Sequence, residues 1–186
     1  MRSTIRPTRL VAAAAVAALA LFAAACGDDE SADTTSSTTT TEALEPCSEV
    51  YAAETSGPEG ADAVEDRGAP EMAACDPEVS ELEIIDVVEG SGAEVAPGAT
   101  VTAHYSGVSA STGEEFDSSW SRGEPASFPL DGVIQGWSEG LVGMKEGGRR
   151  TLVIPAEMAY ADSPPPGSGI APGATLVFTV DMVEVS

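Results

Sequence analysis

The stretch VIQGWSEGLVGM, residues 133–144, is the most informative part of this chain. Its spacing predicts one short helix, interrupted by glycines, with Trp137 directly behind Gly136 at the start. The chain has only two tryptophans, and leucine would fill an ordinary core position there. Two interpretations follow: the indole is an oversized core residue, or it forms the floor of a pocket. We also expect Gly136 to keep the approach to the indole clear.

Segments on both sides of this helix have the pattern of strands. Residues 100–107 alternate, with Val101, Ala103 and Tyr105 on one face and polar residues, His104 among them, on the other. Further strands are expected at 82–90, 150–155 and 174–185, separated by Gly- and Pro-containing turns. We therefore predict an α+β fold, a twisted antiparallel sheet of about five strands wrapped around one short helix.

The usual catalytic groups are missing from this region. His104 is the single histidine, and its place on the polar face of a strand predicts exposure to solvent. With His104 expected at the surface and no second histidine or thiol nearby, we expect neither a Ser-His-Asp triad nor a zinc hydrolase site. Any activity must work without an ionisable nucleophile, a metal or a cofactor.

The first 25 residues have the layout of a secretory signal peptide. Residues 1–9 carry three arginines and no acid, and residues 10–25 are an apolar run that is shorter than the about 20 residues of a membrane span. The run ends at Cys26, a placement that resembles the lipidated cysteine of bacterial lipoproteins. We expect an extracytoplasmic protein anchored to the cell membrane through Cys26. Ordinary cleavage nearby, with a stray cysteine, is the alternative.

The chain is strongly acidic. Its formal net charge is −23, and loss of residues 1–25 removes three arginines and no acid, which gives −26. Such a surface repels phosphate backbones and anionic lipid. We expect no nucleic-acid partner and no membrane contact apart from the lipid anchor.

The segment before residue 80 divides into two parts. Residues 26–46 are rich in Thr and Ser, which indicates a flexible tether. Residues 47–79 are acidic and contain Cys47 and Cys75. Outside the cytoplasm such a pair favours a disulfide over a metal site. We therefore predict a stapled extension, without a functional account of it, followed by one domain over residues 80–186.

At this point the motifs resemble those of a known family. FDSS (116–119), FPL (128–130), VIQGWSEGLVGMKEGGRRTLVIP (133–155), AY (159–160) and GATLVFTVDMVEV (173–185) follow one another in the order and spacing of FKBP-type peptidyl-prolyl cis-trans isomerases. The resemblance covers about residues 82–186. It implies that a proline ring enters a cavity between the sheet and the short helix.

The resemblance also assigns roles to particular residues. The pocket positions of the family fall on Tyr105, Phe116, Asp117, Val133, Ile134, Trp137, Tyr160, Ile170 and Phe178. Trp137 would be the floor of the cavity. The Ile134 backbone N–H and the Tyr160 hydroxyl would each donate to a substrate carbonyl, and Asp117 would lie near the reacting amide.

The chain departs from the family pattern in places. Family members often carry an aromatic residue near Ala126, which predicts a thinner wall here, and the loop 162–173 is unusually rich in proline. This loop contacts substrate in the family and contains Ile170. Its unusual composition therefore bears on the assignment of Ile170 to the pocket. Arg122 either pairs with Asp117, as a basic residue does in relatives, or is solvated.

The resulting hypothesis is a monomeric prolyl isomerase that assists the folding of extracytoplasmic proteins. Its expected partners are proline-containing unfolded or peptide substrates, together with macrolide inhibitors. The main alternative is a non-catalytic module or chaperone that holds proline-containing segments in the same cavity. A third hypothesis is a surface scaffold whose function lies in residues 47–79.

Overall fold

The computed structural model describes residues 43–52 and 63–186. The expected signal peptide, Cys26 and almost all of the predicted tether lie outside these residues. No helix in the described part of the chain is long and apolar enough to cross a membrane.

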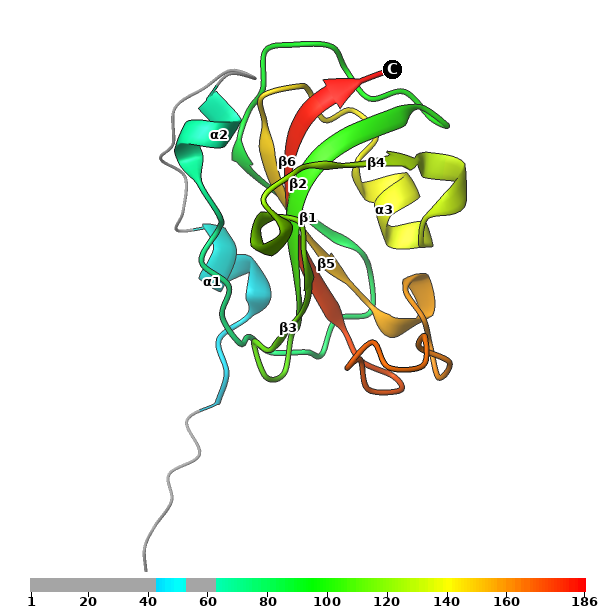
Figure 1. Ribbon diagram of the computed structural model, residues 1–186. Coiled ribbons are helices and arrows are strands. Elements are labelled where there is room, and N and C mark those ends of the chain that lie inside the picture. Colours follow the sequence, from blue (N-terminus) through cyan, green and yellow to red (C-terminus); the bar gives the residue numbers. More distant parts are fainter. Residues whose placement is uncertain (1–42, 53–62) are drawn as a thin grey trace, which may run out of the picture. The chain divides into compact units, whose positions relative to one another are not determined.

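Six antiparallel strands form one sheet (Figure 1). Their spatial order is β1-β5-β6-β2-β3, and β4 also pairs with β2. The strands are β1 (Glu83–Val88), β2 (Thr100–Ser109), β3 (Glu115–Ser118), β4 (Ala126–Pro129), β5 (Arg149–Ile154) and β6 (Leu176–Val185). The four strands predicted individually are all present. The total exceeds the predicted five because the segment 115–129 contributes two short strands to the free side of β2.

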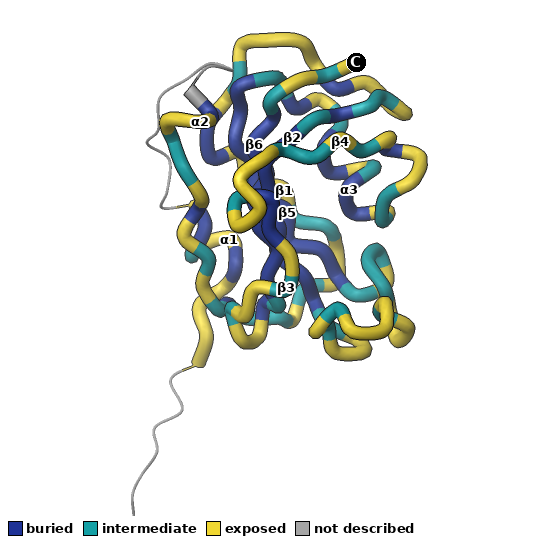
Figure 2. The backbone as a smooth tube through the Cα atoms, viewed as in Figure 1, coloured by how far each residue is buried: buried dark blue, intermediate teal, exposed yellow. Residues whose placement is uncertain are grey.

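The centre of the sheet is buried on both faces (Figure 2). Every residue of β5 and the first seven of β6 are buried, and the buried set includes polar residues such as Arg149, Thr179 and Asp181 as well as apolar ones. On one face, Leu152, Phe178 and Val180 belong to a core that also contains Trp137 of α3 (Gln135–Gly140). The predicted α+β arrangement is confirmed.

Glycine allows α3 to pack closely on β5. A Cβ at Gly136 would overlap the Ile154 side chain, and one at Gly140 would lie 2.7 Å from Leu152 Cδ2. The expectation that Gly136 keeps the approach to the indole clear is therefore wrong. Its hydrogen atom faces the strand, and its role is to bring the helix within contact distance of the sheet.

The structure has more short helices than the single one predicted. Besides α3, the described residues 43–52 and 63–186 contain two α-helices in the segment before the sheet and three 3-10 turns in the connections. They are α1 (Cys47–Ala52), α2 (Ala63–Arg67), η1 (Trp120–Arg122), η2 (Leu130–Gly132) and η3 (Ala156–Met158).

The segment before β1 covers the sheet face that lies opposite α3 (Figure 1). The predicted disulfide joins Cys47 and Cys75, with the Cα atoms 4.9 Å apart. Both cysteines and Tyr51 belong to a second core, together with Val153 and Val177 of the sheet. The sequence pattern changes near residue 80, but residues on both sides of this point pack in the same core.

The prediction that His104 is exposed to solvent is wrong. The residue does lie on the face opposite Tyr105, as the alternation indicated, but it is only 2% exposed. The indole of Trp120 stacks on the imidazole at 4.0 Å, and Glu65 of α2 approaches its other side. An aperiodic segment far away in the sequence covers this face, so the local pattern could not reveal the burial.

Candidate functional site

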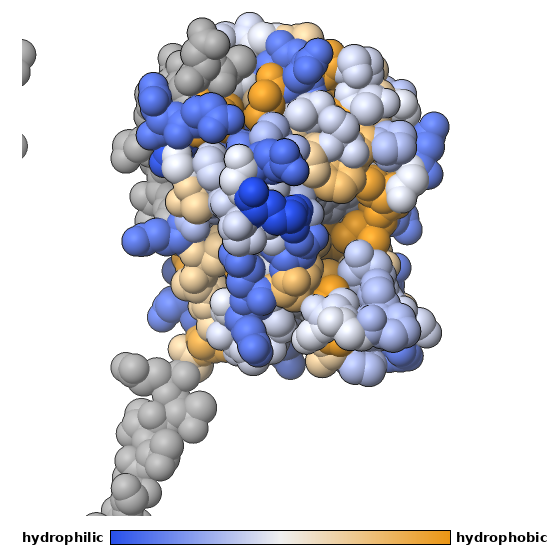
Figure 3. Space-filling model, in the orientation of Figure 1, coloured by the Kyte–Doolittle hydropathy of each residue, from blue (hydrophilic) through white to orange (hydrophobic). Residues whose placement is uncertain are grey.

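A pocket of about 690 Å³ opens between α3, the sheet and the loop that follows η3. On the molecular surface, hydrophobic side chains gather in a hollow at this place (Figure 3). The lining residues are Tyr105, Phe116, Asp117, Phe128, Gly132, Val133, Ile134, Trp137, Tyr160, Pro165, Ser168, Ile170 and Phe178. All nine residues expected at the pocket line it, and their functional roles remain predictions.

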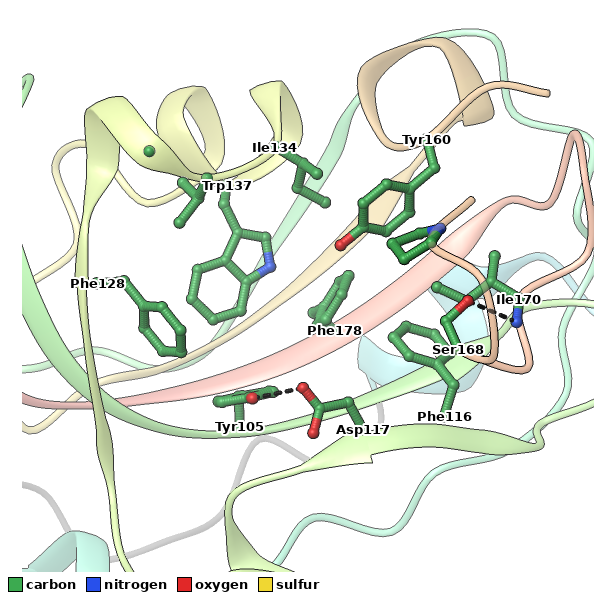
Figure 4. A pocket seen from close by; sticks show the side chains of 13 residues that line it. Tyr105, Phe116, Asp117, Phe128, Ile134, Trp137, Tyr160, Ser168, Ile170 and Phe178 are labelled. Carbon is green, nitrogen blue, oxygen red and sulfur yellow. Dashed lines mark hydrogen bonds between the residues drawn. The ribbon is translucent and has the colours of Figure 1, made fainter. Parts of the chain in front are cut away.

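Trp137 forms the inner part of the pocket (Figure 4). It is 4% exposed, and its ring is edge-on to Tyr105, Phe178 and Phe128, with centroids 5.5, 5.4 and 5.3 Å away. Such edge-to-face contacts suit the charge distribution of aromatic rings. The start of α3 therefore directs the indole onto the sheet, where it is both a core residue and a pocket residue. The two interpretations of Trp137 are compatible.

Gly107 makes room for the aromatic wall next to β3. A Cβ at this position would lie 2.7 Å from the Phe178 ring and 2.8 Å from the Phe116 ring. The two rings themselves meet edge to face at 5.4 Å. A residue without a side chain on β2 thus lets Phe116 lie over the strand and close this side of the pocket.

A polar network lies at the β2–β3 wall. The Tyr105 hydroxyl donates to Asp117 Oδ2 at 2.6 Å, and Arg122 donates to Asp117 Oδ1 and to the Tyr105 hydroxyl, the latter at 2.7 Å. The guanidinium also lies 5.5 Å from the centre of the Tyr105 ring. Of the two interpretations of Arg122, the ion pair with Asp117 is the one observed.

This network keeps each group in one protonation state. Burial alone would raise the pKa of Asp117, but hydrogen bonds from Tyr105 and Arg122 and the Arg122 charge outweigh it, so the pKa lies below its ordinary 3.8. Burial, followed by the hydrogen bond to Asp117, raises the pKa of Tyr105 above its ordinary 10.0. At neutral pH the wall presents an ionised carboxylate and a neutral phenol, neither of which is poised for proton transfer.

The opposite wall supplies hydrogen-bond donors. Tyr160 follows η3, and its hydroxyl points between Trp137 and Phe178 (Figure 4). Ile134 lies directly before α3, where its carbonyl accepts from the N–H of Trp137 at 3.0 Å. Within the described residues the Ile134 N–H itself donates to no acceptor. Two donors are thus available beside an apolar cavity.

Sequence reasoning missed four of the lining residues. Phe128 matters most, because it packs against both Trp137 and Tyr105 and fills the wall that Ala126 was expected to leave thin. Ala126 and Phe128 lie on the same face of β4, two residues apart, and pair with Ala103 and Val101, so the period of two could have located Phe128. Gly132 ends the short turn η2, and Pro165 and Ser168 come from a loop, so periodicity locates none of the three.

Comparisons with known proteins agree with this geometry. A family model described as FKBP-type peptidyl-prolyl cis-trans isomerase matches residues 92–183. The chain is 54% identical over 109 residues to a probable FK506-binding protein of Corynebacterium glutamicum, covering 58% of this chain and 90% of that protein. It is 53% identical over 108 residues to an FK506-binding protein of Streptomyces anulatus, covering 57% and 87%. The crystal structure of FkpA from Escherichia coli superimposes with a TM-score of 0.53 at 44% identity, covering 60% of this chain and 51% of that one.

The matched segment contains the whole pocket. All thirteen lining residues lie between 92 and 183, and so do β2 to β5 and α3. The relative from Corynebacterium glutamicum is covered over nine tenths of its length at more than half identity. The chain belongs to the FKBP-type peptidyl-prolyl cis-trans isomerase family.

Proposed function

We propose that this protein catalyses cis-trans isomerisation of X-Pro peptide bonds in extracytoplasmic proteins, with the proline ring seated on Trp137. The observation that carries the proposal is the aromatic pocket, in which apolar rings line one cavity and two donors without a partner among the described residues lie beside it. Proline-containing unfolded segments are the substrates, macrolides are inhibitors, and the protein acts as a monomer.

The physical basis is desolvation of the amide. Rotation about the C–N bond has a barrier of about 18–20 kcal/mol because resonance gives that bond partial double-bond character. Resonance places negative charge on the carbonyl oxygen, which water stabilises better than an apolar cavity does. A cavity lined by Trp137, Phe178 and Phe128 therefore destabilises the planar amide relative to the twisted one.

Fixed donors and one carboxylate orient the substrate. The Ile134 N–H and the Tyr160 hydroxyl hold carbonyl groups on either side of the proline. Asp117, bound by Tyr105 and Arg122, forms the wall beside the amide and stays ionised throughout. Such preorganised groups favour the twisted geometry without moving a proton.

The required acceleration is within reach of these effects. Uncatalysed exchange takes on the order of 100 s. Turnover of about 1–1000 per second needs roughly 3–7 kcal/mol of barrier lowering. Shape and a few hydrogen bonds can supply this amount.

The place of action follows from the N-terminal residues. An apolar run that ends at Cys26 supports export and lipid anchoring, and the following Thr/Ser-rich residues support a tether. Labelling of cells with a radioactive fatty acid tests this part: the wild-type protein should incorporate label and Cys26→Ser should not. Equal labelling of both would contradict the anchor.

The catalytic proposal is tested with a matched pair of tyrosine variants. Tyr160→Phe removes a hydroxyl from the pocket, whereas Tyr51→Phe removes one that donates to the Ala73 carbonyl on the opposite face of the sheet. With a proline tetrapeptide, Tyr160→Phe should lower kcat/KM about tenfold, the loss of one hydrogen bond made in the transition state. Tyr51→Phe should leave kcat/KM unchanged and lower only stability.

Trp137→Leu extends this test to the apolar part of the pocket, and we expect its kcat/KM to lie below that of Tyr160→Phe. A folded wild-type protein that binds a proline peptide without accelerating its isomerisation would instead identify the non-catalytic binding module.

A further inference from the structure

A row of buried polar side chains, two of them charged, crosses the sheet on the face opposite the pocket. His104 of β2 pairs with Asp181 of β6, which pairs with Arg149 of β5. All three residues are less than 9% exposed. Because side chains alternate along a strand, the row lies directly behind Tyr105, the neighbour of His104.

The segment containing α2 covers this row. Arg67 donates to Asp181 Oδ1 at 2.7 Å and to the Gly147 carbonyl at 2.9 Å, while Arg149 donates to the Gly68 carbonyl at 2.6 Å and to both oxygens of Asp181. A buried carboxylate with two arginines is stable only when its hydrogen bonds are complete. These contacts therefore hold α2, stapled further by the disulfide, onto the sheet.

His104 connects α2 to the pocket wall. Its Nε2 lies 3.4 Å from Glu65 Oε1, and its Nδ1 lies 3.0 Å from Ser119 Oγ. The same Ser119 Oγ accepts the backbone N–H of Tyr105 at 2.8 Å, and the Ser119 N–H donates to the Tyr105 carbonyl at 2.9 Å. Ser119 also begins the η1 turn, from which Arg122 reaches Asp117 and Tyr105.

The contact with Glu65 favours one arrangement of the protons on His104 and Ser119. A carboxylate accepts only, so Glu65 favours the imidazole tautomer with hydrogen on Nε2. Nδ1, at 3.0 Å, is then a nearer acceptor for the Ser119 hydroxyl than the Tyr105 carbonyl at 3.3 Å, and the Ser119 oxygen in turn accepts from the Tyr105 N–H. We propose that His104 is a positioning residue, through which the stapled extension orients the Tyr105–Asp117–Arg122 wall. The role rests on the proposed isomerase function.

The single histidine makes the tautomer directly measurable. Long-range proton–nitrogen NMR, recorded at a pH where the imidazole is neutral, should show hydrogen on Nε2. Glu65→Ala should increase the population of the tautomer with hydrogen on Nδ1, and it should lower kcat/KM about two- to threefold. Asp66→Ala, an exposed acid on the same helix, should change neither. An Nδ1–H ring in the wild type, or a Glu65→Ala spectrum identical to the wild type, would overturn the proposal.

Two replacements of His104 separate positioning from packing. Asn places its amide where Nδ1 was and keeps the contact with Ser119, whereas Gln places its amide where Nε2 was and keeps the contact with Glu65. Both lose the stack with Trp120, so they should lose similar stability. We expect His104→Asn to lower kcat/KM about two- to threefold, as Glu65→Ala does, and His104→Gln to lower it about five- to tenfold.

Equal kcat/KM in the two variants, both folded, would overturn the positioning role. This failure differs from failure of the proposed function, in which the wild-type protein itself gives no acceleration. In that case two other measurements still decide whether His104 orients the wall. One is the imidazole tautomer in the wild type and in Glu65→Ala, and the other is the chemical shift of the Tyr105 amide in the two His104 variants.

Discussion

Tyr105 and His104 are neighbours on β2, yet they lie in two different environments. On the Tyr105 face, aromatic rings surround an open pocket and the Ile134 N–H, within the described residues, has no acceptor. On the His104 face, Asp181 is fully buried between two arginines. The His104 face is fully packed, whereas the Tyr105 face leaves an open pocket. The Tyr105 face is therefore the one that can bind a ligand.

The two faces should therefore respond to mutation in opposite ways. Changes behind the sheet should lower stability and leave the kinetics of the folded protein largely intact, except at His104 and Glu65. Changes in front should lower kcat/KM and leave the fold intact. The following predictions test this division, starting with the largest effect.

Asp181→Asn should destabilise the protein by about 3–5 kcal/mol, because Arg67 and Arg149 would remain buried without a counter-charge. Urea unfolding measures the change. Glu184→Gln, an exposed acid on the same strand, is the control and should alter stability by less than about 0.5 kcal/mol. A loss below about 1 kcal/mol for Asp181→Asn would show that the ion pairs do not hold the two layers together.

Replacing both Cys47 and Cys75 by Ser should cost about 3–4 kcal/mol, the chain-entropy value for a loop of 28 residues. Thermal unfolding with and without a reductant checks this, since reduced wild-type protein should match the double variant. Because Arg67 still holds α2 on the sheet, kcat/KM at a temperature where the variant is folded should stay within about twofold. A larger fall would mean that the staple itself shapes the pocket.

The pocket wall should be insensitive to pH over a wide range. The lowered pKa of Asp117 means that its contribution to stability is present above the ordinary value near 3.8 and is lost as pH falls through the lowered value. The raised pKa of Tyr105 means that its contribution is present below pH 10 and is lost at higher pH. A kcat/KM profile from pH 5 to 9 should therefore show no step from this network. A step that disappears in Asp117→Asn would contradict the assignment.

The smallest expected effect concerns the charge of the substrate. Arg67, Arg122, Arg149 and Arg150 are each paired with a carboxylate, so the outer surface is left strongly acidic. Tetrapeptides with Lys near the proline should have about two- to fivefold higher kcat/KM than matched Glu peptides at low salt. The difference should vanish at about 0.5 M salt, where charges are screened within a few ångströms. A preference that survives high salt would require a direct contact instead.

The sequence predicted the front of the molecule much better than the back. Alternation along 100–107 placed Tyr105 on its face, and the family motifs brought nine lining residues together. Phe128 was missed although it lies two residues from Ala126 and so on the same face of a strand, whereas Pro165 and Ser168 lie in a loop whose path no local rule specifies. The burial of His104 was missed because the covering segment, near Glu65, has no periodicity.

The sequence by itself determined four strands and the short helix, because strand and helix periods follow from local backbone geometry. The pocket residues followed from the family resemblance of the motifs. Only the tertiary structure decided what lies behind the sheet. Arg67 and Asp181 are 114 residues apart, and neither lies in a pattern that indicates a partner. A buried ion pair depends on which groups meet after folding, since charges leave water only where their hydrogen bonds are satisfied in three dimensions.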